Sequence, residues 1–125
     1  SELSVGKDKT GKPRRIKISS QAAAVLASQL EDKLPTAPLF MRSNGKAWSK
    51  ESWKIPIGEA VKAADLPSGA TAYTLRHSTI TDLVTAGLPL LTIAQISGTS
   101  AEMIERHYGH LVSDAAVSAL GTLAL

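Results

Sequence analysis

Three glycines, Gly87, Gly98 and Gly109, divide the second half of the chain into segments that are long enough only for short helices. Each glycine closes a stretch whose apolar residues recur at helical spacing, and glycine commonly follows the last residue of a helix. Pro89, a favourable first-turn residue, marks the start of one of these stretches. We therefore predict helices over residues 75–86, 89–97, 100–108 and 113–123.

The first half of the chain shows a different pattern, in which short alternating segments flank turn residues. Residues 3–5 and 15–18 alternate polar and apolar side chains around a Lys-Thr-Gly-Lys-Pro turn, which predicts a β-hairpin. Ser19 or Ser20 is a suitable N-cap for a helix over about residues 21–30. The class predicted for the whole chain is therefore α+β, mainly α, with a small antiparallel β-hairpin sheet.

Two polar residues predict where later helices begin. Ser49 is a suitable N-cap for a further helix, and Pro56 predicts that this helix is kinked or starts later. One apolar face of that helix is formed by Trp53, Ile57, Val61 and Ala64. Thr99 with Glu102 fits a capping box for the helix over residues 100–108.

The composition is that of an ordinary globular protein. A chain of 125 residues that is 43% hydrophobic and 20% charged is expected to form a single domain over residues 1–125. The absence of cysteine excludes disulfides, thiolate metal sites and a cysteine nucleophile. No apolar run has the length that a bilayer requires. The net charge of +3 favours an anionic partner only weakly.

Positive charge is concentrated at the predicted hairpin. Basic residues recur there within a short stretch that is opposed only by Asp8, and they are Lys7, Lys9, Lys12, Arg14, Arg15 and Lys17. Charge alone is compatible with a solvated hairpin or with a strip that contacts phosphates, whose binding weakens as salt is added.

Arg76 falls in the first turn of the helix predicted over residues 75–86, beside an apolar stripe that includes Ile80 and Val84. A cation at this positive end of a helix is unfavourable by about 0.3–1 kcal/mol, so we expect the arginine to have an anionic partner. Two partners remain open. The guanidinium and the helix N–H groups could together clamp a phosphate, or an acidic side chain of the same chain could form a salt bridge.

Tyr108 falls at the end of the helix predicted over residues 100–108, beside His107 and close to His110. A tyrosine at a helix end is ordinarily a packing residue. Two histidines three positions apart suggest a metal pair, but no third ligand is nearby in the sequence, so we expect no metal.

Four segments together resemble the catalytic domain of tyrosine recombinases of the phage integrase type. Residues 74–78 (TLRHS) resemble the family's Leu-Arg-His-Thr/Ser segment, and residues 91–100 resemble its Leu-Gly-His-Ser turn. Residues 105–110 (ERHYGH) resemble the segment that holds the nucleophile, and residues 6–16 resemble a β-hairpin that carries a catalytic lysine. The order agrees, and the nine-residue spacing from Thr99 to Tyr108 is the family's own. The resemblance extends over about residues 5–115 and implies the family's catalytic-domain fold.

The resemblance implies DNA cleavage without a metal or cofactor. In the family a tyrosine attacks a phosphodiester in line, which leaves a 3′-phosphotyrosyl link and a free 5′-hydroxyl. Tyr108 matches this nucleophile, and Arg76 matches the second arginine, which holds the non-bridging oxygens. Lys9 matches the hairpin lysine that protonates the leaving oxygen, with Lys7 and Lys12 as alternatives. A phenol, with an ordinary pKa of about 10, needs activation, and the charge that develops on the phosphate needs fixed cations.

Three features depart from the family's pattern. Tyr73 stands where the family usually has a histidine, and Thr99, which is also the predicted N-cap, stands where a histidine or tryptophan is expected. His77 is a candidate for part of the histidine role. The family's first arginine lies upstream of the hairpin, where this chain begins, so we expect a fragment of a catalytic domain that also lacks the preceding DNA-binding domain.

The expected partner is double-stranded DNA, bound through the basic residues of the hairpin, and the expected location is cytoplasmic in a bacterial or phage-encoded system. The C-terminal segment, which includes the last predicted helix, carries Leu111, Ala115, Leu120 and Leu123. This face docks on other recombinase protomers, as the resemblance implies, or packs on its own domain. Two alternatives to the enzyme remain. One is a non-catalytic DNA-binding or protein-interaction module derived from a recombinase, and the other is a helical regulatory or antitoxin-like protein that makes no use of Lys9 and Arg76.

We predict that the 125-residue chain cleaves DNA slowly by itself, because one of the two phosphate-holding arginines that the resemblance implies has no counterpart in it. Covalent trapping on a nicked suicide substrate measures this rate, with a chain extended upstream as the comparison. Equal trapping rates for the two chains would contradict the prediction.

Overall fold

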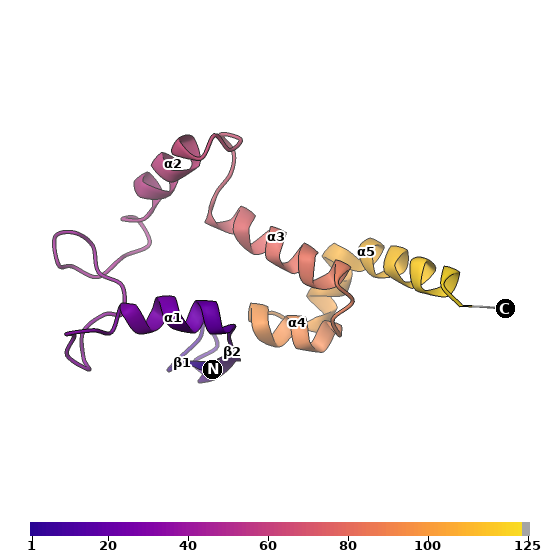
Figure 1. The fold of residues 1–125 in the computed structure, drawn as a ribbon, viewed down its shortest axis with the longest axis horizontal. Helices are drawn as coiled ribbons and strands as arrows, with labels where there is room; N and C mark the ends of the chain where they lie inside the picture. Colours follow the sequence, from indigo (N-terminus) through magenta and orange to yellow (C-terminus); the bar gives the residue numbers. More distant parts are fainter. Residues whose placement is uncertain (124–125) are drawn as a thin grey trace. The chain divides into compact units, whose positions relative to one another are not determined.

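The computed structural model of the chain describes residues 1–123 and confirms the predicted α+β class (Figure 1). The elements, in order, are β1 (Glu2–Val5), β2 (Arg14–Lys17), α1 (Ser20–Ser28), α2 (Lys54–Ala63), α3 (Ala72–Thr85), α4 (Leu90–Ser97) and α5 (Ala101–Gly121). They belong to two compact units, Ser1–Ala64 and Asp65–Leu125, which are described separately below. None of the helices within residues 1–123 combines the length and the apolar content that crossing a membrane requires.

The first unit opens with the predicted β-hairpin. Strands β1 and β2 pair antiparallel, and Leu3 stands opposite Ile16, where both side chains are half-buried on one face of the ribbon. On the other face the Arg15 guanidinium lies 3.7 Å from the Glu2 carboxylate. Helix α1 follows directly, and the Ser19 hydroxyl accepts a hydrogen bond from the Ala22 N–H, which confirms Ser19 as the N-cap.

The first unit also contains a tight turn at Asn44 and Gly45. Gly45 has a φ of 78°, a left-handed conformation that glycine adopts without steric cost, and the Arg42 N–H donates to the Lys46 carbonyl across the turn. The Arg42 guanidinium lies 6.0 Å from the centre of the Trp48 ring, within the range of a cation–π contact.

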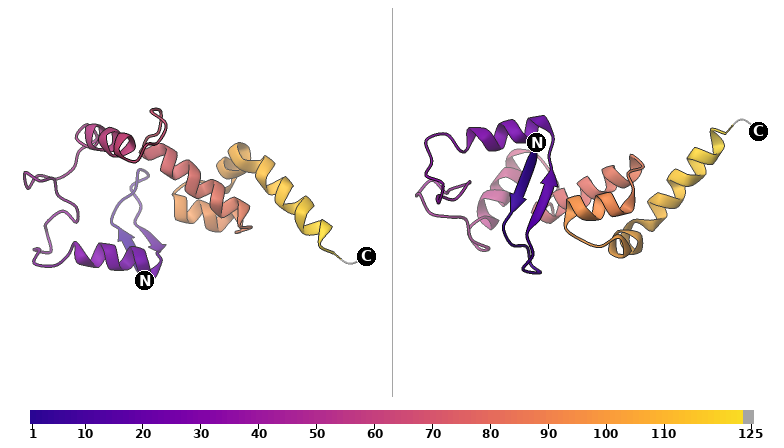
Figure 2. Two further views of the ribbon diagram at one scale, coloured as in Figure 1. Left: turned by 45° about the horizontal axis from the view of Figure 1, so that its top comes forward. Right: turned by 90° about the horizontal axis from the view of Figure 1, so that it is seen from below.

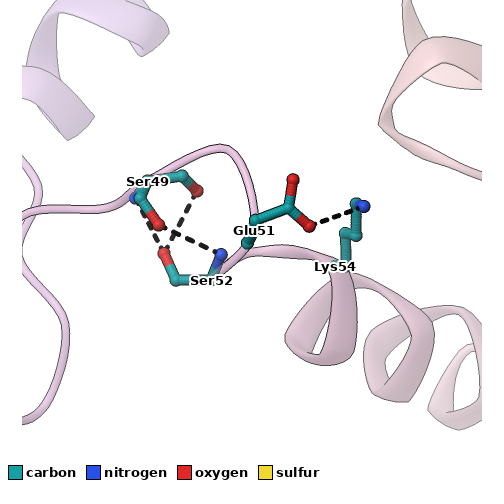
Figure 3. A network of polar contacts seen from close by, with 4 residues as sticks. All are labelled: Ser49, Glu51, Ser52 and Lys54. Carbon is teal, nitrogen blue, oxygen red and sulfur yellow. Dashed lines mark hydrogen bonds and ion pairs between the residues drawn. The ribbon is translucent and has the colours of Figure 1, made fainter.

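Helix α2 begins later than a Ser49 cap would place it, so that prediction was wrong. Ser49 and Ser52 instead bond to each other in a turn that precedes the helix, where the Ser49 N–H donates to the Ser52 hydroxyl over 2.7 Å (Figure 3). Lys54, the first residue of α2, forms an ion pair of 2.7 Å with Glu51 in the same turn. The late start was anticipated from Pro56, which lies in the first turn, where the missing N–H would have no helical partner.

The second unit is a group of three helices, α3, α4 and α5, that pack on one another (Figure 2). Helix α3 begins at Ala72, three residues before the predicted start, because Thr71 and Thr74 form a reciprocal capping box. Among residues 1–123, the buried hydrophobic side chains all come from this unit and form one cluster. They are Ile80, Val84, Ile93, Ala94, Ile104 and Tyr108.

Residues 101–121 form one helix, whereas the sequence predicted two helices separated by Gly109. A glycine inside a helix costs about 1 kcal/mol relative to alanine, which is less than the gain from burying large apolar side chains on both sides of it. Ile104, Tyr108 and Leu111 recur at helical spacing and all contact the core, so the apolar stripe continues through Gly109. Tyr108 therefore lies within a helix and not at its end.

The N-cap of α5 is Ser100, so the predicted cap at Thr99 was wrong. The Ser100 hydroxyl accepts from the Met103 N–H over 3.2 Å, whereas the Thr99 N–H closes the end of α4 by donating to the Ala94 carbonyl. Thr99 therefore belongs to the turn that ends α4, and the next residue, Ser100, caps α5.

We predict that Ser100→Ala lowers the free energy of unfolding by about 1 kcal/mol, because it leaves an N–H of the first turn of α5 without its acceptor. Thr99→Ala is the matched control, and it is expected to change stability by less than about 0.5 kcal/mol. Urea unfolding followed by circular dichroism measures both variants. A larger loss in Thr99→Ala than in Ser100→Ala would restore the original assignment.

Candidate active site

One pocket of the second unit, of about 360 Å³, brings together five residues that the sequence singled out. They are Tyr73, Arg76, His77, Thr99 and Tyr108. The remaining lining residues are Ile80, Met103, Ile104 and His107. The pocket is therefore lined partly by apolar side chains of the core and partly by side chains that carry hydroxyl, imidazole and guanidinium groups.

The core packing places these side chains next to one another. On a helix, residues three or four positions apart lie on the same face. Arg76 and His77 precede the buried Ile80 by four and three residues on α3, and Tyr108 follows the buried Ile104 by four on α5. Contact between α3 and α5 therefore brings both faces to the same pocket.

Tyr108 is buried, and its hydroxyl is hydrogen-bonded to Nδ1 of His77. The centres of the two rings lie 5.9 Å apart at an interplanar angle of 45°. The ring of Tyr73 is also close to His77, in a T-shaped arrangement with 5.2 Å between the ring centres and an angle of 71°. His77 thus contacts both tyrosines, bonded to one and packed against the other.

Arg76 is the fifth residue of α3, so its prediction as a first-turn residue was wrong. Its guanidinium lies instead at the C-terminal end of α4, where Nη1 donates to the Ser97 carbonyl over 2.5 Å. That carbonyl is in the last turn, where helical acceptors lack partners and a cation is favourable. Within residues 1–123 no carboxylate forms a salt bridge with Arg76, which removes the internal ion pair as its explanation.

The turn that ends α4 exposes the Ser97 carbonyl to Arg76. Gly98 has a φ of 69°, and both its N–H and that of Thr99 donate to the Ala94 carbonyl. The Ser97 carbonyl, one of the terminal acceptors of α4, accepts from the side chain of Arg76. Arg76 still has four of its five N–H groups beyond this bond, which is enough for a planar contact with two phosphate oxygens.

Lys9 belongs to the first unit, where it lies in the turn between β1 and β2 and is exposed. Asp8 organises this turn: its carboxylate accepts from the Thr10 hydroxyl over 2.6 Å, from the Thr10 N–H over 2.7 Å and from the Lys12 N–H over 3.2 Å. Gly11, with a φ of 78°, completes the turn. The candidate lysine is therefore held on an internally bonded loop.

These hydrogen bonds, that of the Thr10 hydroxyl first, lower the pKa of Asp8 below its ordinary value of 3.8. A carboxyl group whose pKa is lowered by folding contributes to stability at pH values above its ordinary pKa. That contribution is lost as the pH falls through the lowered value, when the carboxylate gains a proton.

The other basic residues of the hairpin are placed as the sequence predicted, on the strands and the turn. Lys7, Lys12, Arg15 and Lys17 are exposed, and Arg14 is half-buried. In β2, Arg15 and Lys17 lie on the face opposite to Ile16, so their charges line one side of the ribbon.

Three features of the site were missed in the sequence. Asp8 was taken only as an opposing charge, although an aspartate two residues before a threonine, with a glycine next, is a recognisable Asx-turn signal. His107 and Met103 were not expected in the pocket, since they join it only through the packing of α5. The role of the Ser97 carbonyl could not be predicted, because every residue type has the same backbone carbonyl. No group of three or more potential metal ligands is found among the described residues.

Comparisons with known proteins agree on one family. The model of the phage integrase family matches residues 1–114. The tyrosine recombinase XerD of Staphylococcus saprophyticus is 33% identical over 84 residues, which cover 66% of this chain and 28% of that relative. The match thus spans little more than a quarter of the relative's length. No solved structure matches the chain.

We predict that Thr10→Val raises the pKa of Asp8 toward its ordinary value, because the largest cause of the lowered pKa is removed while the backbone donors stay. An NMR titration of the Asp8 carboxyl carbon measures the change, and Thr36→Val, also in a loop of the first unit, is the control. An unaltered Asp8 titration in Thr10→Val would show that the hydroxyl does not hold the carboxylate.

Proposed function

Because this chain belongs to the phage integrase family of tyrosine recombinases, we propose that it acts in site-specific DNA recombination and integration. The proposed reaction cleaves and rejoins DNA strands through a 3′-phosphotyrosyl intermediate on Tyr108. The observation that carries this proposal is the shared pocket, in which a tyrosine hydroxyl and a guanidinium come from different helices. A phosphodiester needs both groups, one to attack the phosphorus and one to hold its oxygens.

Tyr108 and Arg76 have distinct roles in the proposed step. The Tyr108 oxygen forms a bond to phosphorus as the bond from phosphorus to the 5′-oxygen breaks. Negative charge builds up on the non-bridging oxygens during this exchange, and a guanidinium fixed beforehand stabilises it without reorganising. The bond from Arg76 to the Ser97 carbonyl supports this role, because it holds the arginine in place while further N–H groups stay available.

Lys9 completes the proposed chemistry as the general acid. Its ammonium would give a proton to the leaving 5′-oxygen, so that a hydroxyl departs in place of an alkoxide. This role rests on the resemblance of the hairpin, and the ordered Asp8 turn supports it by restricting the loop that carries the lysine. We propose that residues 1–125 act as a single catalytic domain, because the family model matches residues 1–114 without interruption.

The proposed partner is double-stranded DNA. The basic residues of the hairpin would contact backbone phosphates, and such contacts carry no sequence information by themselves. Their exposure supports the proposal, as does the position of Arg15 and Lys17 on one side of the ribbon. The fit of the family model across the hairpin and the helices adds to it.

Other recombinase protomers are proposed as a second partner, through the end of α5. The face predicted for this contact is divided in the structure. Leu111 packs against the core, whereas Leu120 and Leu123 are 65% and 60% exposed. Val117, nearby on the same helix, is 70% exposed. Exposed apolar residues at one helix end support a docking role for that end.

A non-catalytic module derived from a recombinase is the alternative. Tyr73 and Thr99 favour it, since they stand at positions where the resemblance implies proton-transferring or phosphate-binding side chains, and both line the pocket. Detection of a covalent adduct with DNA separates the two functions, because only the enzyme forms a covalent bond with DNA.

We predict that Tyr108→Phe abolishes the covalent adduct with DNA while binding is retained, because the variant lacks only the hydroxyl and keeps the buried ring. The probe is a pool of nicked duplexes with randomised sequence around the nick, and adducts are detected on denaturing gels. Tyr73→Phe is the matched control for the other tyrosine of the chain, and it should still form an adduct. Arg76→Ala should slow adduct formation by about 10²–10³-fold.

The control outcomes are equally informative. Retained binding is measured by fluorescence anisotropy on an intact duplex, which shows that the Phe variant has kept its DNA surface. A chain extended upstream that binds DNA but forms no adduct on any member of the pool would favour the non-catalytic module. An adduct that persists in Tyr108→Phe and disappears in Tyr73→Phe would assign the nucleophile to the other tyrosine.

A further inference from the structure

We infer that His77 is the catalytic base of this site, which orients the Tyr108 hydroxyl and accepts its proton through Nδ1 as the phenol attacks phosphorus. The inference rests on the proposed function, because it assigns a role in the step for which Tyr108 is the nucleophile. It deepens that function by naming the group that activates the phenol. Such a group is needed because Tyr73 stands where the resemblance implies a histidine.

The direct contact between the two side chains carries the inference. Nδ1 of His77 and the hydroxyl of Tyr108 are hydrogen-bonded, although 31 positions separate the residues in the sequence. A base has to lie within hydrogen-bond reach of the proton that it removes, and His77 meets this requirement. A phenol is mostly protonated at neutral pH and is a weak nucleophile in that form, so it needs such a partner.

The surrounding packing fixes this contact. Ile80 and Ile104, which lie one helical turn from His77 and Tyr108, are 4% and 1% exposed and belong to the same core cluster. The rings of Tyr73 and His77 are T-shaped, with 5.2 Å between their centres, so the imidazole has a second aromatic neighbour besides Tyr108.

The proton balance of the step follows from the atoms in contact. Before attack, neutral His77 carries its proton on Nε2, so that Nδ1 accepts from the Tyr108 hydroxyl. As the bond from Tyr108 to phosphorus forms, the phenolic proton moves to Nδ1 and the imidazole becomes a cation. The bond to the 5′-oxygen breaks, and that oxygen takes a proton from Lys9, as proposed above. His77 accepts one proton and becomes a cation, and Lys9 donates one proton and becomes neutral, so the protons balance.

This role makes cleavage dependent on pH. A protonated His77 donates from Nδ1 and has no lone pair for the phenolic proton, so the proposed step requires the neutral imidazole and slows when acid protonates it. The other titratable or charged groups that face the pocket are Tyr73 and Arg76 on α3 and His107 on α5. Helix α4 (LLTIAQIS) contributes no ionisable side chain.

The first experiment tests the contact without DNA. The chain has two tyrosines and three histidines, so tyrosine labelled with ¹³C at Cζ gives two signals, which Tyr73→Phe assigns. We expect the Tyr108 signal to shift in a step that follows the titration of His77, and we expect this step to disappear in His77→Gln. His107→Gln is the matched control from the same pocket, and the step should remain there. A Tyr108 signal without a step in the wild-type chain overturns the inference before any variant is made.

The second experiment measures the reaction on the same pool of nicked duplexes. We expect the rate of adduct formation by the wild-type chain to rise with pH through the His77 titration. In His77→Gln, which keeps a polar side chain but does not titrate, the rate should be lower by about 10²-fold or more and the rise should be absent. An unaltered pH profile in His77→Gln refutes the role of His77 and leaves Tyr108 as the nucleophile. A Tyr108 step in the spectrum, with no adduct from the wild-type chain or from a chain extended upstream, refutes the proposed function and the proton transfer with it, and leaves only the hydrogen bond standing.

Discussion

The packing of α3, α4 and α5 around Ile93 and Ile104 is the constraint on which the second unit depends. The side chains of Ile93 and Ile104 are 0% and 1% exposed. Tyr108, the candidate nucleophile, is a buried member of the same cluster. The interactions that stabilise the three helices are therefore also those that set the geometry of the site. A change in the core that shifts α5 relative to α3 would alter the distance between Tyr108 and His77.

Arg76 illustrates how an apparently unfavourable residue is accommodated. Its helix starts at Ala72, which places the arginine beyond the positive end of the α3 dipole. Its guanidinium then reaches the negative end of α4, where an acceptor is available. One contact thus satisfies a terminal carbonyl and orients a cation toward the pocket. An arginine held in this manner loses little conformational freedom when it meets a phosphate.

The features that could be predicted from the sequence are those decided by neighbouring residues. The hairpin, the cap at Ser19 and the end of α4 at Gly98 follow from local turn and capping chemistry. The continuation of α5 through Gly109 could not be predicted, because the penalty for glycine is local and the compensating burial comes from other helices. The same holds for the partners of Tyr108 and Arg76, which depend on how α3 meets α4 and α5. The candidate residues were selected by their order and spacing in the sequence, which carry no information about their contacts.

Gly98 shows how far a backbone conformation can restrict a sequence. Its φ of 69° is disfavoured by roughly 1–2 kcal/mol for residues with a Cβ atom, and among these asparagine and aspartate tolerate it best. A bulkier residue would relax by rotating the peptide that links it to Ser97, and the carbonyl that accepts from Arg76 would turn with it. The choice of amino acid at position 98 is therefore limited by an arginine more than twenty positions earlier. A substitution at Gly98 would therefore reduce activity by changing the backbone conformation, although glycine has no side chain that could contact the substrate.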